Sequence, residues 1–254
     1  MRVTMLGCGG SGGVPLVGGV WGNCDPAEPR NRRRRASILV EQGGTTLVVD
    51  TGPDFREQML SADVRSLDAV LFTHAHADHS HGIDDLRAVN RMMGRPIAVH
   101  GDAATLRQLR ERFAYAFRPI EAGSHFYKPT LEAHEIGGPF RVGDIDVVPF
   151  EQDHGYSRTL GFRFGRIGYS TDVVRLDEAA FAALAGIDVW IVDCLREEPH
   201  PTHSHLARTL EWIERVRPRR AILTHMTELL DYASLRARLP EGVEPGYDGL
   251  VVQE

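Results

Sequence analysis

Three histidines and one aspartate lie close together in the sequence, directly after an apolar stretch that predicts a buried strand. The stretch is Asp68–Thr73, and the motif that follows is His74-Ala-His76-Ala-Asp78-His79. Because the strand ends here, the four polar side chains are expected to gather at one edge of a sheet. Imidazole nitrogens and carboxylate oxygens are the ligands that zinc and similar divalent ions prefer. The sequence therefore predicts a metal site at this edge.

Further ligands are expected from other strand ends, because four side chains cannot complete two metal sites. Three candidates, His154, Asp172 and His225, each follow a predicted strand. Each of these strands would place one ligand at its end, as a rigid metal site built from several strands requires. Asp50 ends another predicted strand, and we expect it to orient a ligand or the turn that follows.

The composition is that of an ordinary globular protein. Apolar residues make up 42% and charged residues 25% of the 254 residues, so a sizeable core is available. A net charge of −6 excludes a generally basic surface for nucleic acid. The three cysteines are scattered and indicate a reducing compartment. With no signal-peptide pattern and no apolar run of about 18 residues, we expect a cytoplasmic protein without a membrane segment.

Short β-rich stretches alternate with helical patterns along the chain. Strands are predicted at Ser37–Glu41, Thr45–Asp50, Asp68–Thr73, Ile97–His100, Ile145–Phe150, Leu160–Phe164, Ile167–Ser170, Val189–Asp193 and Ala221–Thr224. Helices are predicted at Phe55–Leu60, Ile83–Met93, Ala103–Phe117, Asp177–Leu184, Leu206–Val216 and Tyr232–Leu239. Hairpins with helices between single strands favour a layered α/β sandwich with mixed sheets. No break in composition divides the chain, so we expect a single domain over residues 1–254.

The order of the metal motifs resembles that of the metallo-β-lactamase superfamily, over nearly the whole chain. This resemblance implies a four-layer αββα sandwich with two mixed β-sheets and a site for two divalent ions, Zn²⁺ or Mn²⁺. The implied ligands are His74, His76 and His154 for one ion, Asp78, His79 and His225 for the other, and Asp172 for both. We expect Asp78 to act as a catalytic residue as well as a ligand.

An aspartate at the bridging position resembles the hydrolase and phosphodiesterase branches of the superfamily. In such a site, two ions activate a bridging water and stabilise the attacking and leaving oxygens of an in-line displacement. Cys194 follows the end of a predicted strand, and we interpret it as a small buried residue rather than a ligand.

A second histidine group, His200, His203 and His205, precedes the predicted helix that begins at Leu206. An alkoxide leaving group needs a proton donor. Counted back from Leu206, His203 falls where phosphodiesterase members of the superfamily carry a catalytic histidine that is not a ligand. We therefore expect His203 to act as general acid or to bind phosphate. His205 is the second candidate for this substrate contact, and His200 is expected at the rim.

A glycine-rich stretch, Gly7–Pro15, follows the first strand and allows close backbone approach to a ligand. No GK[ST] follows, so it is not a P-loop; Ser11 within it is a candidate substrate contact. With Asn23–Pro26, Pro29–Arg35 and Tyr247–Leu250, this stretch resembles the phosphoribosyl cyclic phosphodiesterases of the carbon–phosphorus lyase pathway.

Many of these relatives carry a cysteine cluster for a structural zinc in the N-terminal loop. Here only Cys24 remains, and Gly19 and Trp21 stand where other cysteines would fall, so we predict no structural zinc. The basic run Arg32–Arg35 has two interpretations. In the first, it is a solvated charged turn. In the second, one or two of its arginines bind phosphate. Because side chains alternate along a strand, only every second arginine of the run could then point toward the site.

The favoured function is a phosphodiesterase for a small phosphodiester, either phosphoribosyl 1,2-cyclic phosphate or a cyclic or linear nucleotide. The alternatives are a tRNA 3′-processing endonuclease and a non-phosphate hydrolase such as a lactonase or thioesterase. An endonuclease of this kind needs a long basic arm, but predicted helices fill the segment from Asp85 to His154. We therefore expect a small phosphorylated substrate and no stable nucleic-acid complex. The apolar loop around Trp21 suggests a contact between two copies in a homodimer.

Overall fold

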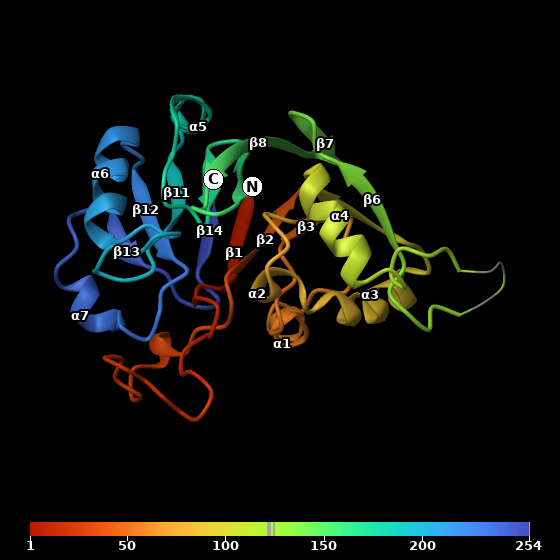
Figure 1. Ribbon diagram of the computed structural model, residues 1–254, viewed down its shortest axis with the longest axis horizontal. Coiled ribbons are helices and arrows are strands. Elements are labelled where there is room, and N and C mark those ends of the chain that lie inside the picture. The colour runs from red at the N-terminus through yellow and green to blue at the C-terminus, as the bar shows by residue number, and fades with distance from the viewer. Residues whose placement is uncertain (121–122, 124, 254) are drawn as a thin grey trace.

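The computed structural model describes residues 1–120, 123 and 125–253, and it contains two seven-stranded β-sheets (Figure 1). In spatial order, the first sheet consists of β14 (Val251–Gln253), β1 (Arg2–Gly7), β2 (Ser37–Gln42), β3 (Thr45–Val49), β4 (Ala69–Leu71), β5 (Ile97–Gly101) and β6 (Leu131–Glu135). The second consists of β13 (Val243–Pro245), β12 (Arg220–Thr224), β11 (Val189–Asp193), β10 (Ile167–Ser170), β9 (Arg158–Phe164), β8 (Ile145–Asp153) and β7 (Phe140–Val142).

Both sheets are mixed, as predicted. In the first, β14, β1, β2 and β3 pair antiparallel, whereas β3 to β6 pair parallel. In the second, β7 to β10 pair antiparallel, whereas β10 to β13 pair parallel. The helices are α1 (Phe55–Ser61), α2 (Ala77–Ser80), α3 (Leu86–Met93), α4 (Ala103–Arg112), α5 (Glu178–Leu184), α6 (Leu206–Val216) and α7 (Tyr232–Arg236), with short 3₁₀ turns η1 (Pro29–Asn31) and η2 (Ile83–Asp85).

Alternation along the strands of the first sheet produces the layers. Ile38 and Val40 of β2 join the core between the two sheets, whereas Leu39 joins the core beneath the helices. In the same way, Val48 of β3 faces α1, α3 and α4, because successive strand residues point to opposite faces. Helices α5, α6 and α7 lie beside the second sheet (Figure 1). The predicted four-layer αββα sandwich is confirmed.

The ends of several elements differ from the sequence prediction. The helix expected to reach Phe117 ends at Arg112, because the chain turns there and buries Ala116 in the core under the helices. The helix expected over Ile83–Met93 begins with a 3₁₀ turn, and α2 forms inside the metal motif itself. The three-residue strands β7, β13 and β14 are too short to carry a readable alternation.

The arginine run binds four different parts of the protein. The buried Arg33 guanidinium donates to the carbonyl oxygens of Thr227 at 3.0 Å and Leu230 at 2.6 Å, so it ties the N-terminal loop to the segment after β12. Further contacts join Arg32 to Trp21, Arg34 to Asp248 and Arg35 to Asp54. These contacts favour the charged-turn interpretation over phosphate binding.

We expect the replacement Arg33→Met to destabilise the protein by about 2–4 kcal/mol, because it removes the charged donor from the carbonyl oxygens of Thr227 and Leu230, which keep the Leu230 N–H at 3.3 Å and the Cys24 thiol at 3.4 Å as donors. Thermal unfolding checks this. Cys24→Ser is the matched control: Cys24 lies 3.9 Å from Arg33 Nη1 and is equally buried. Without a structural zinc, Cys24→Ser leaves the metal content and the melting temperature unchanged. Loss of a zinc ion from Cys24→Ser would show that our interpretation of this loop is wrong.

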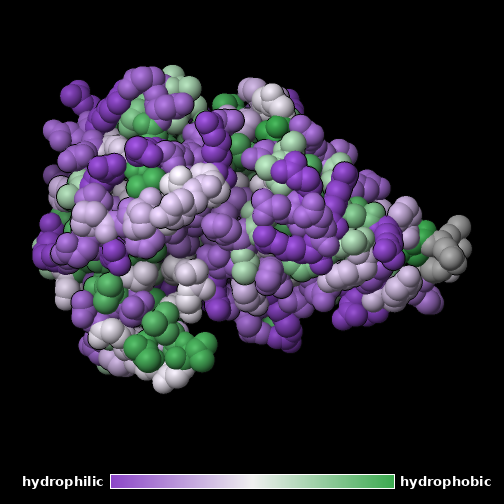
Figure 2. Space-filling model, in the orientation of Figure 1, coloured by the Kyte–Doolittle hydropathy of each residue, from purple (hydrophilic) through white to green (hydrophobic). Residues whose placement is uncertain are grey.

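The tip of the N-terminal loop exposes apolar side chains. Val17 is 95% and Val20 is 51% exposed, and Figure 2 shows this tip as a hydrophobic projection at the lower left of the molecule. No helix in the described part of the chain combines the length and the apolar character that a bilayer-spanning segment needs.

Candidate metal centre

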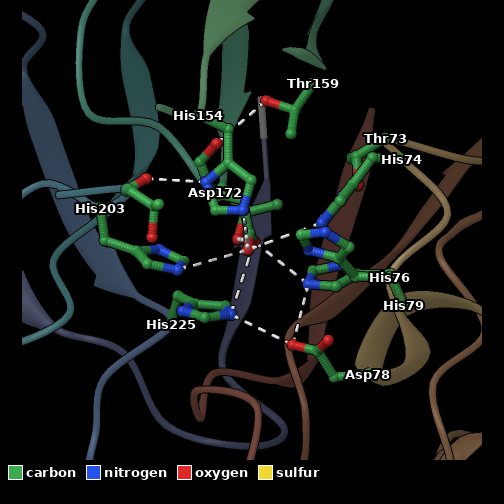
Figure 3. Close-up of polar contacts among 12 residues, drawn as sticks. Thr73, His74, His76, Asp78, His79, His154, Thr159, Asp172, His203 and His225 are labelled. Atoms are coloured by element: carbon green, nitrogen blue, oxygen red, sulfur yellow. Dashed lines mark hydrogen bonds and ion pairs between the residues drawn. The ribbon is translucent and has the colours of Figure 1, made fainter. Parts of the chain in front are cut away.

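The seven predicted ligands come together in one cluster, with their nitrogen and oxygen atoms turned toward a common centre (Figure 3). The segment after β4, which includes α2, supplies four of them from the first sheet, and the ends of β8, β10 and β12 supply three from the second. Their nitrogen and oxygen atoms form two groups: His74, His76, His154 and Asp172, and Asp78, His79, Asp172 and His225. Both groups correspond to the partition that the resemblance implies.

Asp172 lies between the two groups and turns one carboxylate oxygen toward each. Its Oδ1 lies 3.8 Å from Nε2 of both His74 and His154. Its Oδ2 lies 3.1 Å from Nε2 of His79 and 3.4 Å from Nε2 of His225. The side chain therefore has the placement of a bridging ligand.

The spacing of the donor atoms suits binding to divalent ions better than direct hydrogen bonds between the side chains. The buried Nε2 atoms of His74, His79 and His225 have no hydrogen-bond partner among the described residues. The distances from Asp172 nevertheless lie between 3.1 and 3.8 Å. Two donors bound tetrahedrally to one ion at about 2.0–2.1 Å are about 3.3 Å apart. The nitrogens thus converge on shared points, as ligands do.

Neighbouring acceptors fix the direction of two of the predicted ligand rings. Nδ1 of His154 donates to the Thr202 carbonyl oxygen at 2.7 Å, and Nδ1 of His79 donates to Asp50 Oδ2 at 2.7 Å. Each ring therefore keeps Nε2 for the metal centre. Asp50 also accepts from the backbone N–H and the hydroxyl of Thr73, so it holds the ligand and the strand end, as expected from the sequence.

The local electrostatics differ between the two groups. Burial lowers the pKa of His74 well below its ordinary value, so this imidazole is neutral and ready to bind an ion. Burial also acts to lower the pKa of His225, but the carboxylates of Asp172, Asp78 and Asp193 together outweigh it and raise that pKa to about 9. Burial acts to raise the pKa of Asp172, but His225 and His79 hold it well below its usual range.

Burial acts to lower the pKa of His79, but Asp172, Asp78 and Asp50 together raise it well above its ordinary value, so we expect His79 and His225 to carry protons before a metal ion binds. Metal binding at pH 7 is expected to release about two protons, since ligating imidazoles must be neutral. Affinity should rise with pH up to about 9, the pKa of His225. Titration calorimetry in buffers of different ionisation enthalpy measures the release. An affinity independent of pH between 6 and 9 would contradict this account.

For the same reason, protonated His225 stabilises the metal-free fold. This stabilisation is complete below the ordinary histidine pKa of about 6.5. It is lost as the pH rises through about 9.

Three strand ends at the site adopt left-handed backbone conformations. Asp50, Asp172 and His225 have φ values of 65°, 55° and 57°. Such values are uncommon for residues other than glycine, and they persist where the surrounding structure enforces them. The sharp turn after each strand directs these side chains toward the centre.

His203 lies beside the predicted ligands and outside both of these groups, and its ring forms a third, smaller cluster of possible donor atoms with Asp193 and His225. Its Nε2 is 3.8 Å from Asp172 Oδ1, and its Nδ1 donates to Asp193 Oδ2 at 3.2 Å. His205 occupies the N-cap of α6, and no contact between its side chain and the ligands is found in the described part of the chain. The ring centroid of His200 lies 5.3 Å from that of His203, at the rim, as expected.

Other predicted site residues have simpler environments. Ser11 is exposed, and its carbonyl oxygen accepts from Arg35 Nε at 3.2 Å. Cys194 is fully buried in the core, and burial raises its pKa, which fits a small apolar residue. The sequence analysis missed the roles of Asp193 and Thr202. The signal available for Asp193 was its position at the end of a predicted strand, close to where the ligand candidates stand in their own strands.

Comparison with known proteins places the chain in a family. The family described as "Beta-lactamase superfamily domain" matches residues 45–226. A crystal structure of a diphosphatase from the PhnP family superimposes with a TM-score of 0.90 and 31% identity, over 100% of this chain and 97% of that one.

Curated relatives show partial matches. An octanoyltransferase of Porphyromonas gingivalis is 33% identical over 98% of this chain and 51% of that protein. Ribonuclease Z of Methanopyrus kandleri is 30% identical over 51% of this chain and 43% of that protein. The chain thus spans about half the length, or less, of these curated relatives. The family match includes every ligand candidate, and the structural likeness extends over the whole chain; the chain belongs to the metallo-β-lactamase superfamily, in its PhnP-like group.

Proposed function

We propose that this chain is a metal-dependent phosphodiesterase that hydrolyses a small phosphodiester, either phosphoribosyl 1,2-cyclic phosphate or a cyclic or linear nucleotide. The observation that carries the proposal is the position of Asp172 between two sets of ligand atoms. Two neighbouring ions suit the in-line displacement at phosphorus. Similarity to a PhnP-family diphosphatase and to ribonuclease Z supports a phosphoester substrate.

The proposed ligands are His74, His76, His154 and Asp172 for one ion, and Asp78, His79, Asp172 and His225 for the other. When bound, the two divalent ions, Zn²⁺ or Mn²⁺, supply Lewis acidity and lower the pKa of a water molecule. His76 is exposed and Asp78 is half-buried, so the site opens to solvent on their side. Asp78 contacts His79 and His225 through Oδ2, which leaves Oδ1 to orient an entering water molecule.

His203 is the proposed proton donor to the leaving oxygen. Its side chain is 10% exposed, and its Nε2 faces the Asp172 carboxylate from outside both proposed ligand groups. A proton donor held in this position speeds the cleavage of phosphodiesters whose leaving group is an alkoxide, because an alkoxide leaves slowly without a proton. Ser11 and His205 stay proposed contacts to the substrate at the rim.

The test is a hydrolysis panel with the metal-reconstituted protein. It contains phosphoribosyl 1,2-cyclic phosphate, 2′,3′-cyclic nucleotides, linear dinucleotides and precursor tRNA, with a lactone and a thioester as controls. We expect turnover of at least one small phosphodiester and none of the controls. Cleavage of precursor tRNA alone would replace the proposal with the endonuclease alternative, and turnover of the lactone or thioester alone would overturn it.

As protein partner we propose a second copy of the chain, in contact through the apolar loop tip. The exposed Val17 and Val20 support this homodimer.

A further inference from the structure

Two polar side chains of the β8–β9 hairpin are buried behind Asp172. Gln152 and Thr159 stand opposite each other in the antiparallel pair of β8 and β9, and both are buried. Neither is a ligand candidate or a proposed catalytic residue. Burying an amide or a hydroxyl is costly unless the group is hydrogen-bonded. The partners of these two side chains therefore indicate what the pair does.

Both side chains donate to the peptide groups that flank the Cα atom of Asp172. Nε2 of Gln152 donates to the carbonyl oxygen of Thr171 at 3.0 Å, and the hydroxyl of Thr159 donates to the carbonyl oxygen of Asp172 at 3.0 Å (Figure 3). Gln152 Nε2 also donates to Thr159 Oγ1 at 3.1 Å. The two amide hydrogens and the one hydroxyl hydrogen are thus each used once, in a single connected pair.

The backbone of Asp172 needs such support because it is left-handed. Its φ of 55° is uncommon for a residue with a Cβ atom and persists only where the surroundings enforce it. The carbonyl groups held by Gln152 and Thr159 belong to the peptides before and after this Cα. Fixing both peptides fixes φ and ψ of the residue between them. The hydroxyl of Thr171 donates to Asp172 Oδ2 at 2.7 Å and so holds the carboxylate as well.

The amide of Gln152 is placed for its nitrogen contacts alone. Its Oε1 is buried and has no hydrogen-bond partner among the described residues. A Cβ atom at position 161 would lie 2.7 Å from this oxygen, so Gly161 leaves the space that the amide occupies. An unpaired buried oxygen costs free energy that an apolar side chain of the same size avoids. Packing alone therefore does not explain a glutamine here, whereas its bond to the Thr171 carbonyl oxygen does.

We propose that Gln152 and Thr159 are positioning residues of the metal centre, which hold Asp172 in the backbone conformation that directs its carboxylate between the two ligand groups. The inference rests on the bridging role proposed for Asp172. Without the pair, the left-handed backbone would relax and the carboxylate would no longer face both groups. The ligand candidate His154 follows β8 two residues after Gln152. One hairpin thus supports a direct ligand and the bridge together.

The test compares Thr159→Val with Thr159→Ser in titrations of the metal-free protein with Zn²⁺. Valine has the shape of threonine without the hydroxyl, whereas serine keeps the hydroxyl. We expect Thr159→Val to weaken Zn²⁺ binding by about 10- to 100-fold, as is usual when a partner behind a metal ligand is lost. Thr159→Ser should bind Zn²⁺ as the wild-type protein does. Wild-type affinity in Thr159→Val would overturn the proposal.

Thr209→Val is the matched control for the loss of a buried hydroxyl. Thr209 is fully buried and donates to the backbone carbonyl oxygen of Asp193 at 2.7 Å. It therefore makes the same kind of bond to the end of β11, a strand that carries none of the seven proposed ligands. Thr209→Val should keep wild-type affinity for Zn²⁺. An equal loss of affinity in Thr209→Val and Thr159→Val would reduce the effect to general destabilisation and overturn the positioning role.

Electron paramagnetic resonance of the Mn²⁺-loaded proteins gives a readout that a merely stabilising role would not change. Two Mn²⁺ ions about 3.5–4 Å apart that share a carboxylate are magnetically coupled, whereas separate ions give the spectrum of an isolated ion. We expect a coupled spectrum in the wild-type protein and in Thr159→Ser, and a weaker or lost coupling in Thr159→Val. Unchanged coupling in Thr159→Val would overturn the positioning role. A wild-type protein without coupling would instead contradict the bridge on which the inference rests.

Gln152→Met tests the same pair from the other strand and keeps the proposal testable if Thr159→Val does not fold. Methionine has a similar size but donates no hydrogen bond, so Thr171 loses the donor to its carbonyl oxygen. We expect the same weakening of Zn²⁺ binding by about 10- to 100-fold. Wild-type affinity in folded Gln152→Met would overturn the proposal. Neither measurement requires turnover of a phosphodiester, so failure here is distinguishable from failure of the proposed substrate class.

Discussion

Replacing Asp172 with alanine will remove both metal ions and nearly all phosphodiester hydrolysis. One carboxylate faces both ligand groups, with His74 and His154 on Oδ1 and His79 and His225 on Oδ2. Without it, each ion loses a ligand and the pair loses its common anion. Loss of a residue that only orients a ligand typically costs 10- to 100-fold, so loss of a ligand shared by two ions should exceed about 100-fold.

Elemental analysis after gel filtration, together with initial rates, checks this expectation. Asp146→Ala is the control, because Asp146 is a carboxylate on β8 that is mostly exposed and pairs with Arg141 at the surface. It should keep two ions per chain and full activity. A wild-type protein that is fully active with one ion per chain would contradict the dinuclear mechanism, whatever Asp172→Ala does.

His203→Ala will keep both ions and lose catalytic rate. The ring lies outside both ligand groups, so metal binding does not depend on it, whereas a general acid contributes about 10²–10⁴-fold. The loss should be large for a ribosyl or alkyl leaving group. It should be small for nitrophenolate, which departs without a proton. Steady-state kinetics on the two substrate types, combined with metal analysis, gives the comparison.

Other outcomes for His203→Ala point to other roles. Equal losses on both substrates, mainly in KM, would make His203 a phosphate contact. Loss of an ion would make it a ligand. His205→Ala is the matched variant, since His205 is only two residues away at the N-cap of α6. If His205→Ala loses most of its activity while His203→Ala behaves as wild type, counting back from Leu206 gave the wrong histidine.

The sequence predicted the layers, and the side chains that gather at the candidate metal centre, for clear physical reasons. Metal ligands are a rare chemical combination, and the strand ends at which they occur can be read from apolar runs. The two-sided alternation of residues such as Ile38 and Leu39 likewise follows from local periodicity.

Contacts between distant segments could not be read in this way. Arg33 binds carbonyl groups that lie 194 and 197 positions further along the chain, and no local pattern distinguishes it from Arg32 or Arg34. The left-handed conformation of Asp172 and the hydrogen bonds of Asp193 also depend on neighbours that meet only in the folded chain.

The division of the proposed ligands between the two sheets has a thermodynamic consequence. His74 and His76 come from the first half of the chain, whereas His154 and His225 come from the second. An ion bound to both halves acts as a reversible cross-link that the unfolded chain cannot form as a complete set. Each tenfold rise in free metal above the dissociation constant then adds about 1.4 kcal/mol to the free energy of unfolding. The metal supply of the surroundings would therefore set how long this protein persists folded, as well as how fast it works.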